Sequence, residues 1–159
     1  SLKSGLKVDP KNAKAYFQLG NARIMKRQFN AALKDFKVAY SIDKELWQAV
    51  NNKSLVLYEL GEKKKAIKTW EEALKINEDP EPKLALAVAL NSITPGNQKS
   101  IKLAMEALME SPDYVYEKYR EDQLWGKKIQ KATKKLLENP NLKNSINKAL
   151  ARSNFENGL

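Results

Sequence analysis

The side chains that could perform catalysis are few in this chain, and their spacing keeps them apart. The sequence has no histidine and no cysteine, which removes the usual general base near neutral pH, thiol nucleophiles and disulfides. Carboxylates occur side by side only at pairs such as Glu71-Glu72 and Glu121-Asp122. Adjacent residues on a helix point in different directions, so neither pair can serve as acid and base on one substrate. We therefore predict no catalytic residue, no metal ligand, no cofactor and no small-molecule substrate.

Basic side chains offer a different chemistry, the binding of an anionic partner. The chain has 29 Lys and Arg against 19 Asp and Glu, a formal net charge of +10. One lysine run is Lys63-Lys64-Lys65, and a second group lies on a helix expected after residue 125, with Arg120 expected nearby. The members of the second group are Lys127, Lys128, Lys131, Lys134 and Lys135. Nucleic acid and anionic membranes are therefore candidate partners, although lysines on a solvated helix face have the same pattern.

A repeating apolar pattern indicates which elements carry these side chains. Ala66, Trp70 and Ala73 are spaced by four and three residues, so they share one face of a helix. The pattern recurs 34 positions earlier and 34 positions later without any insertion. Its counterparts are Ala32, Phe36, Ala39, Ser100, Ala104 and Ala107. A fixed period of this size on helical residues predicts stacked helical repeats.

The residues of the first complete unit resemble a known repeat family. In chain order they are Tyr16, Leu19-Gly20, Ala32 and Phe36, and Asp9-Pro10 closes the preceding unit. An aromatic residue, then Leu-Gly, then Ala-x-x-x-Phe, with a proline that closes each unit, is the pattern of the tetratricopeptide repeat, which these residues resemble. The later units depart from it at Lys53-Ser54 and Ala87-Val88, where Leu-Gly is expected. The resemblance implies an all-α fold, a right-handed solenoid of stacked helix-turn-helix repeats with a concave groove.

The repeat period also divides the chain into segments. We expect repeats over residues 1–112, namely a partial repeat over 1–12 and three 34-residue units that begin at residues 13, 47 and 81. After residue 112 the phase is lost, and a new apolar stripe begins. The stripe consists of Trp125, Ile129, Ala132 and Leu136. Because the last repeat of a solenoid must cover an apolar end, we predict a helical cap over residues 113–153, followed by a frayed tail over 154–159.

A second face of the opening helix in each unit is not required for the repeat core, and we call it the groove face. Its residues are Lys14, Phe17, Gln18, Asn21, Ile24, Met25, Gln48, Asn51, Asn52, Leu55, Tyr58, Glu59, Ala89 and Ser92. In the family that the chain resembles, this face lines the groove that holds a peptide or a helix. Amide side chains such as Asn21 and Asn52 can donate to and accept from a peptide backbone. The alternative is that these residues pack against each other or against the cap.

One subset of the family clamps a C-terminal carboxylate with two asparagines and several basic residues. Asn21 and Asn52 occupy positions that match the two asparagines. Phe17, Pro82 and Leu86 stand where basic residues are needed. A carboxylate requires charged donors to offset its desolvation, so an acidic chaperone tail is not the expected ligand.

These features together predict a non-catalytic protein–protein interaction module that holds a protein or peptide segment in its groove, with a scaffold or assembly role within a longer protein. The alternative is a basic helical module for nucleic acid or an anionic membrane surface, and weak nonspecific contact with either follows from the charge alone. The sequence shows no signal peptide and no apolar run of about 18 residues, and a cytoplasmic location is favoured.

Overall fold

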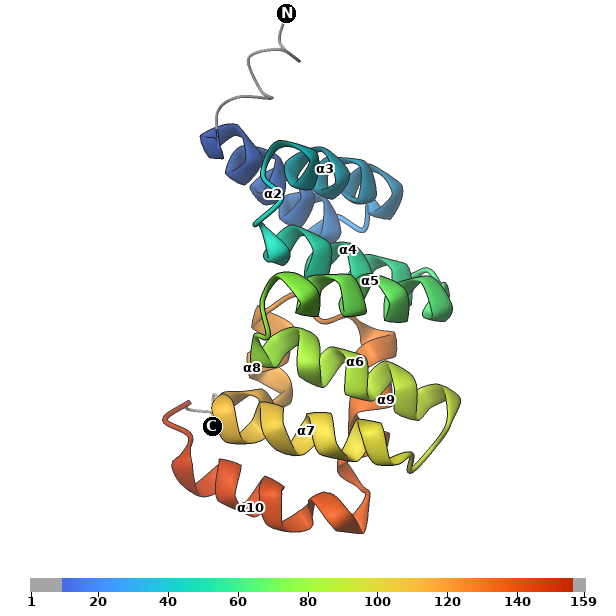
Figure 1. Ribbon diagram of the computed structural model, residues 1–159, viewed down its shortest axis with the longest axis vertical. Coiled ribbons are helices and arrows are strands. Elements are labelled where there is room, and N and C mark those ends of the chain that lie inside the picture. Colours follow the sequence, from blue (N-terminus) through green and yellow to red (C-terminus); the bar gives the residue numbers. More distant parts are fainter. Residues whose placement is uncertain (1–9, 156–159) are drawn as a thin grey trace, which may run out of the picture. The chain divides into compact units, whose positions relative to one another are not determined.

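The computed structural model describes residues 10–155, and the regular elements in this range are all helices (Figure 1). The chain divides into two compact units, with the boundary between Asn77 and Glu78. The expected partial repeat falls largely on residues 1–9, outside the described residues. The predicted all-α class is confirmed for the described part of the chain.

The first unit contains two helical hairpins. Its helices are α2 (Pro10–Met25), α3 (Phe29–Ile42), α4 (Trp47–Glu59) and α5 (Lys63–Ile76). Helix α2 packs against α3, α4 packs against α5, and α3 contacts α4, so the two hairpins stack on each other. The prediction of stacked helix-turn-helix repeats is therefore confirmed within this unit.

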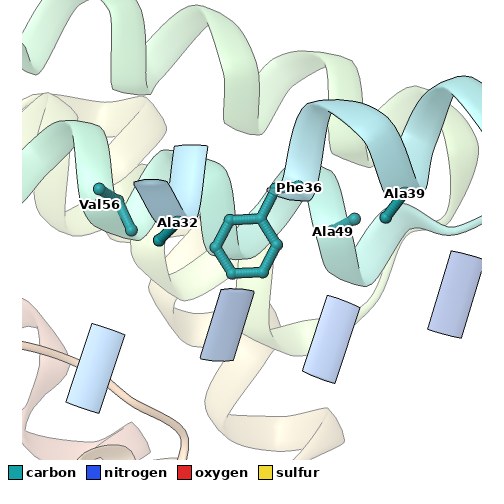
Figure 2. Close-up of a cluster of buried hydrophobic side chains, with 5 residues drawn as sticks. All are labelled: Ala32, Phe36, Ala39, Ala49 and Val56. Carbon is teal, nitrogen blue, oxygen red and sulfur yellow. The ribbon is translucent and has the colours of Figure 1, made fainter. Parts of the chain in front are cut away.

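The core of the first unit is built from the predicted apolar stripe. Figure 2 shows Phe36 with the small residues Ala32 and Ala39 of α3 and with Ala49 of α4. Gly20 of α2 allows this packing, because a Cβ atom there would lie 2.5 Å from Cε1 of Phe36. The absence of a side chain at residue 20 thus brings α2 and α3 close together.

The turns inside the two hairpins require a left-handed backbone. Arg27 has φ of 59°, and Gly61, which occupies the same position of the next repeat, has φ of 85°. Glycine adopts this conformation at little cost, whereas other residues are strained by about 1–2 kcal/mol. The first turn therefore carries strain that the second avoids.

The second unit contains one hairpin and the C-terminal segment. Its elements are α6 (Pro80–Ile93), α7 (Gln98–Glu110), η1 (Pro112–Val115), α8 (Glu117–Asp122), α9 (Lys127–Leu137), η2 (Pro140–Leu142) and α10 (Lys143–Arg152). Helices α6 and α7 pack as a pair. Asp79 is the N-cap of α6, because its Oδ1 accepts a hydrogen bond from the Glu81 backbone N–H at 2.9 Å. Pro80 occupies the first turn of the helix.

The C-terminal segment does not form a fourth hairpin of the same kind. Helix α9 packs against α6 and α10 packs against α7, whereas α9 and α10 do not form a packed pair. Glu81 of α6 joins the segment to the hairpin, because its carboxylate accepts from Tyr114 Oη and from Trp125 Nε1, each at 3.1 Å. The predicted cap stripe of Trp125, Ile129, Ala132 and Leu136 is buried.

Of the tail expected over residues 154–159, the structure describes residues 154 and 155. Ser153 Oγ donates to Asp113 Oδ1 at 2.5 Å. The Phe155 ring packs against Tyr116 and Tyr119, with ring centroids 5.7 and 5.3 Å apart. Apolar contact therefore holds residue 155 in place, and residues 156–159 lie outside the described residues.

Candidate functional site

The groove face of α2 is the most accessible part of the predicted binding surface. Lys14, Gln18 and Met25 are exposed, with Met25 at 75 %. Phe17, Asn21 and Ile24 are half-buried. Phe17 and Ile24 pack partly against the core, and the Phe17 ring lies 6.0 Å from that of Phe36. This helix presents a mixture of apolar and polar side chains to solvent.

The groove face of α4 is much less accessible than the sequence predicts. Gln48 and Glu59 are half-buried, while the four other residues are no more than 7 % exposed. These are Asn51, Asn52, Leu55 and Tyr58. The assignment of Tyr58 outside the core is wrong, because its side chain is 2 % exposed and its ring lies 6.2 Å from the Trp70 ring. Helix α4 therefore contributes mostly to packing.

The groove face of α6 is also less accessible than the sequence predicts. Ala89 is fully buried, and Ser92 is half-buried with its Oγ donating to the Ala89 carbonyl at 2.7 Å. Helix α9 packs against α6. Ala89 therefore takes part in packing, as the alternative interpretation of these residues expects, and does not line an open groove.

A chain of three hydrogen bonds crosses the first unit, and we call it the amide relay. Trp70 Nε1 donates to Asn51 Oδ1 at 3.0 Å. Asn51 Nδ2 donates to Asn52 Oδ1 at 3.0 Å, and Asn52 Nδ2 donates to Asn21 Oδ1 at 2.8 Å. The relay runs from a buried indole on α5 through α4 to the half-buried Asn21 on α2.

The amide relay has a fixed direction, because an indole N–H can only donate. Asn51 must turn its oxygen toward Trp70, and the orientation of each following amide is then determined. Asn21 receives a hydrogen bond at Oδ1, so its Nδ2 group points away from the relay as a donor. No acceptor within residues 10–155 takes a hydrogen bond from Asn21 Nδ2. The end of the relay can therefore donate to an acceptor on a bound partner.

The sequence contains a signal for this relay that the groove interpretation missed. Asn51 and Trp70 are the counterparts, in the next repeat, of Phe17 and Phe36. The same two repeat positions therefore make a ring contact in the first hairpin and a hydrogen bond in the second. An amide that appears together with an indole at paired repeat positions indicates a buried hydrogen bond.

The lysine group of α9 has the predicted exposure, but Arg120 does not belong to it. All five lysines from Lys127 to Lys135 are exposed. Arg120 is 4 % exposed and donates from Nε to Gln130 Oε1 at 2.8 Å and from Nη1 to the Tyr114 carbonyl at 2.7 Å. Burial lowers the pKa of Arg120 to about 10. Its role is to hold the start of the cap together.

We also searched the described part of the chain for a metal site and for a membrane-spanning helix. No group of three or more carboxylates gathers there in a way that could hold a metal ion. None of the helices between residues 10 and 155 is both long enough and apolar enough to cross a membrane.

Comparison with known proteins supports the repeat assignment. Residues 48–80, which include most of α4 and all of α5, match the family model of the tetratricopeptide repeat. This segment is thus similar to a tetratricopeptide repeat, a unit that generally serves in protein–protein interaction scaffolds and generally lacks catalytic activity. No curated protein sequence matches the chain.

Proposed function

We propose that the first unit binds a segment of a partner protein across the groove face of α2, next to the open end of the amide relay. The observation that carries this proposal is the fixed donor at Asn21 Nδ2 beside the exposed side chains Gln18 and Met25. A positioned donor next to an apolar side chain suits a ligand with both a hydrogen-bond acceptor and an apolar group.

The chemistry of the donor restricts the form of the partner segment. Carbonyl oxygens in the middle of a helix already accept hydrogen bonds from the same helix, whereas an extended segment has carbonyls to offer. The α2 groove face carries one main charge, Lys14, and the α4 groove face carries Glu59. An extended and weakly charged segment with an apolar residue close to an accessible carbonyl is the ligand that fits these features.

Because α4 and α6 bury most of their groove faces, the proposed site is smaller than the sequence predicted. It includes Lys14, Phe17, Gln18, Asn21 and Met25 of α2. The buried residues of α4 contribute indirectly, since Asn51 and Asn52 fix the orientation of the Asn21 amide. The module would act as a scaffold that holds its partner without catalysis.

The experiment uses a substitution that changes only the open end of the relay. Asn21→Asp keeps an oxygen that accepts from Asn52 but replaces the outward donor with a second acceptor. Asn30→Asp, at an exposed position on α3, is the matched control, because it changes the charge equally within the same unit. Affinity capture from a lysate of the source cells, with quantitative mass spectrometry, compares the three proteins.

We expect a protein that is captured equally by the parent chain and by Asn30→Asp, and about tenfold less by Asn21→Asp. Circular dichroism and thermal unfolding check that both variants keep the fold. Capture of the same proteins at the same level by all three chains would contradict the proposal.

The exposed lysines of α9 support a second candidate, the binding of a polyanion. If only counterion release drives it, affinity for a single-stranded RNA should fall by orders of magnitude between about 50 and 200 mM salt. Reversing Lys127, Lys131 and Lys134 to Glu should weaken it further. RNA or anionic-vesicle binding that is submicromolar at about 200 mM salt and depends on these lysines would place this candidate first.

A further inference from the structure

The second unit contains a groove between α7 and α10 that neither the repeat core nor the proposed site uses. It has a volume of about 500 Å³, and its lining is mainly apolar. We call it the α7–α10 groove. Its principal lining residues are Ile101, Met105 and Met109 of α7 and Lys148, Ala149 and Arg152 of α10. Figure 1 shows α10 alongside α7.

The two helices run in the same direction, so the groove extends along both of them. At one end, a Cβ atom at Gly96 would lie 4.0 Å from Nδ2 of Asn139. At the other end, Arg152 Nη1 donates to the Met109 carbonyl at 3.0 Å. The lining of α7 extends from Gln98 to Met109, which corresponds to about 16 Å, or roughly three helical turns. The groove therefore has the length of a short helical segment.

The groove exists because the cap does not follow the repeat pattern. In the first unit, α3 packs against α4, which forms a hairpin with α5. In the second unit α9 packs against α6, and α10 lies beside α7 rather than forming a hairpin with α9. Helix α10 covers the outer face of α7 only in part, and Met105 and Met109 remain 44 % and 66 % exposed.

Comparison with the other repeats shows that these two methionines are unusual. The residues 68 positions earlier, on α3, are Lys37 and Ser41, and those 34 positions earlier, on α5, are Glu71 and Lys75. All four are exposed. The earlier repeats therefore place polar side chains where α7 has apolar ones. Exposed apolar residues at positions where the earlier repeats are polar indicate a surface that a binding partner covers.

The rim of the groove is positively charged. Lys102, Lys148 and Arg152 are exposed, and no carboxylate of the described residues forms an ion pair with them. Glu106 also lines the groove, but it lies 3.7 Å from Nζ of Lys83, which offsets its charge. The surface that faces a ligand is thus positive along both edges and apolar along the floor.

We propose that the α7–α10 groove docks an acidic amphipathic helix of a partner protein. Apolar side chains on one face of that helix would contact Ile101, Met105 and Met109, which follow one another at intervals of four along α7. Carboxylates on its flanks would meet Lys102, Lys148 and Arg152. A concave groove of this volume accepts inserted side chains, which a bilayer surface does not supply. The site belongs to the second unit and does not depend on the proposal for α2.

The test uses a designed probe of about 14 residues, a fluorescein-labelled helical peptide with Leu on one face and Glu on both flanks. A scrambled peptide has the same composition but distributes the leucines around the helix. Fluorescence anisotropy measures the affinity of each peptide for the complete chain. A difference between the two peptides separates recognition of the apolar stripe from attraction of charge.

The principal variant carries Met105→Lys and Met109→Ser, the residues that α3 has at the same repeat positions. It adds a positive charge, so charge alone would strengthen binding of an acidic peptide. A second variant, Lys148→Glu, leaves α7 unchanged and tests the rim. The matched control carries Lys127→Glu and Lys131→Glu on α9, and Met25→Lys tests an exposed methionine of the other unit.

We expect the probe to bind the parent chain at least about tenfold more tightly than the scrambled peptide does. The Met105 and Met109 variant and Lys148→Glu should each lose about tenfold or more, while the α9 and Met25 controls should change by less than about threefold. Equal binding of the scrambled peptide, or unchanged affinity in the methionine variant, would overturn the proposal. So would methionine-dependent binding of phosphatidylserine vesicles without probe binding, or a dimer of the chain that the same substitutions abolish.

Discussion

The indole Nε1 of Trp70 lies 3.0 Å from Oδ1 of Asn51, and this single hydrogen bond determines the direction of the amide relay. Both residues are fully or nearly fully buried, at 0 and 1 % exposure. A buried amide that loses its partner costs about 1–3 kcal/mol, so the pair also stabilises the first unit. The position of Trp70 on α5 therefore determines which group of Asn21 points outward at the surface of α2.

The first prediction concerns this pair. Trp70→Phe removes the donor and some volume, and should lower the free energy of unfolding by about 2–4 kcal/mol. Asn51→Phe alone should also destabilise, because a phenyl ring beside the indole overpacks the core. The double variant reproduces the Phe17–Phe36 pair of the first hairpin, and should lose less than the sum of the two single losses. Urea unfolding of the four proteins measures the coupling, and strict additivity would contradict the assignment.

A second prediction corrects the expectation for Tyr58. Because its ring is 2 % exposed and contacts Trp70, Tyr58→Ala should cost about 3–5 kcal/mol, comparable to Trp70→Ala. Met25→Ala provides the comparison, since a side chain that is 75 % exposed should change stability by less than about 0.5 kcal/mol. Thermal unfolding of the three variants measures these effects. A small loss at Tyr58 would restore the view that it belongs to an open groove.

The sequence predicts the helices well because their determinants are local and repeat at a fixed period. The stripe from Trp125 to Leu136 is buried as predicted, and the repeated core residues Ala32, Phe36 and Ala39 lie on one buried face of α3. Periodicity identifies which residues share a face, but it does not tell what covers that face. Tyr58 and Ala89 are therefore predicted at the surface, although neighbouring helices bury them.

The position of Arg120 in the sequence likewise does not show whether its charge lies at the surface. A guanidinium near five lysines suggests a common surface, yet two acceptors on other elements hold it in the interior. Likewise, no sequence pattern showed that α9 and α10 would separate and leave the α7–α10 groove. That arrangement depends on contacts of Glu81 with Tyr114 and Trp125, which are 33 and 44 residues away in the chain.

The third prediction concerns the left-handed turn at Arg27. Arg27→Gly should stabilise the first unit by about 0.5–1 kcal/mol, because glycine adopts φ of 59° without strain. The loss of the Arg27 contact with the Phe29 ring, 5.2 Å away, reduces this gain. Gly61→Ala should destabilise by about 1 kcal/mol at the same repeat position, where φ is 85°. Chemical unfolding gives both values, and changes of equal sign would show that the turns are not equivalent.

The fourth prediction is a pH dependence. Burial and then the negative charge of Glu81 raise the pKa of Tyr114 far above its usual 10.0. Above about pH 10 the unfolded chain has lost this proton while the folded chain retains it, so stability falls as the pH rises. Tyr114→Phe lacks the ionisable group but loses the hydrogen bond to Glu81.

The parent chain should therefore exceed Tyr114→Phe in stability by about 1 kcal/mol near pH 8, and this difference should shrink toward pH 11. Comparing the two proteins cancels the contribution of other titrating groups. Urea unfolding at several pH values measures the difference, and a constant or growing gap would contradict the buried ion–phenol contact.

The central claim, that a partner lies on the groove face of α2, is tested most directly by site-specific photo-crosslinking. A photoreactive benzoylphenylalanine replaces exposed Gln18 on that face or, as control, exposed Lys34 on α3. We predict a crosslinked protein partner from residue 18, little or none from residue 34, and loss of the crosslink when Asn21→Asp is added. Equal crosslinking from both positions, or a crosslink at residue 18 that Asn21→Asp leaves unchanged, would contradict the account.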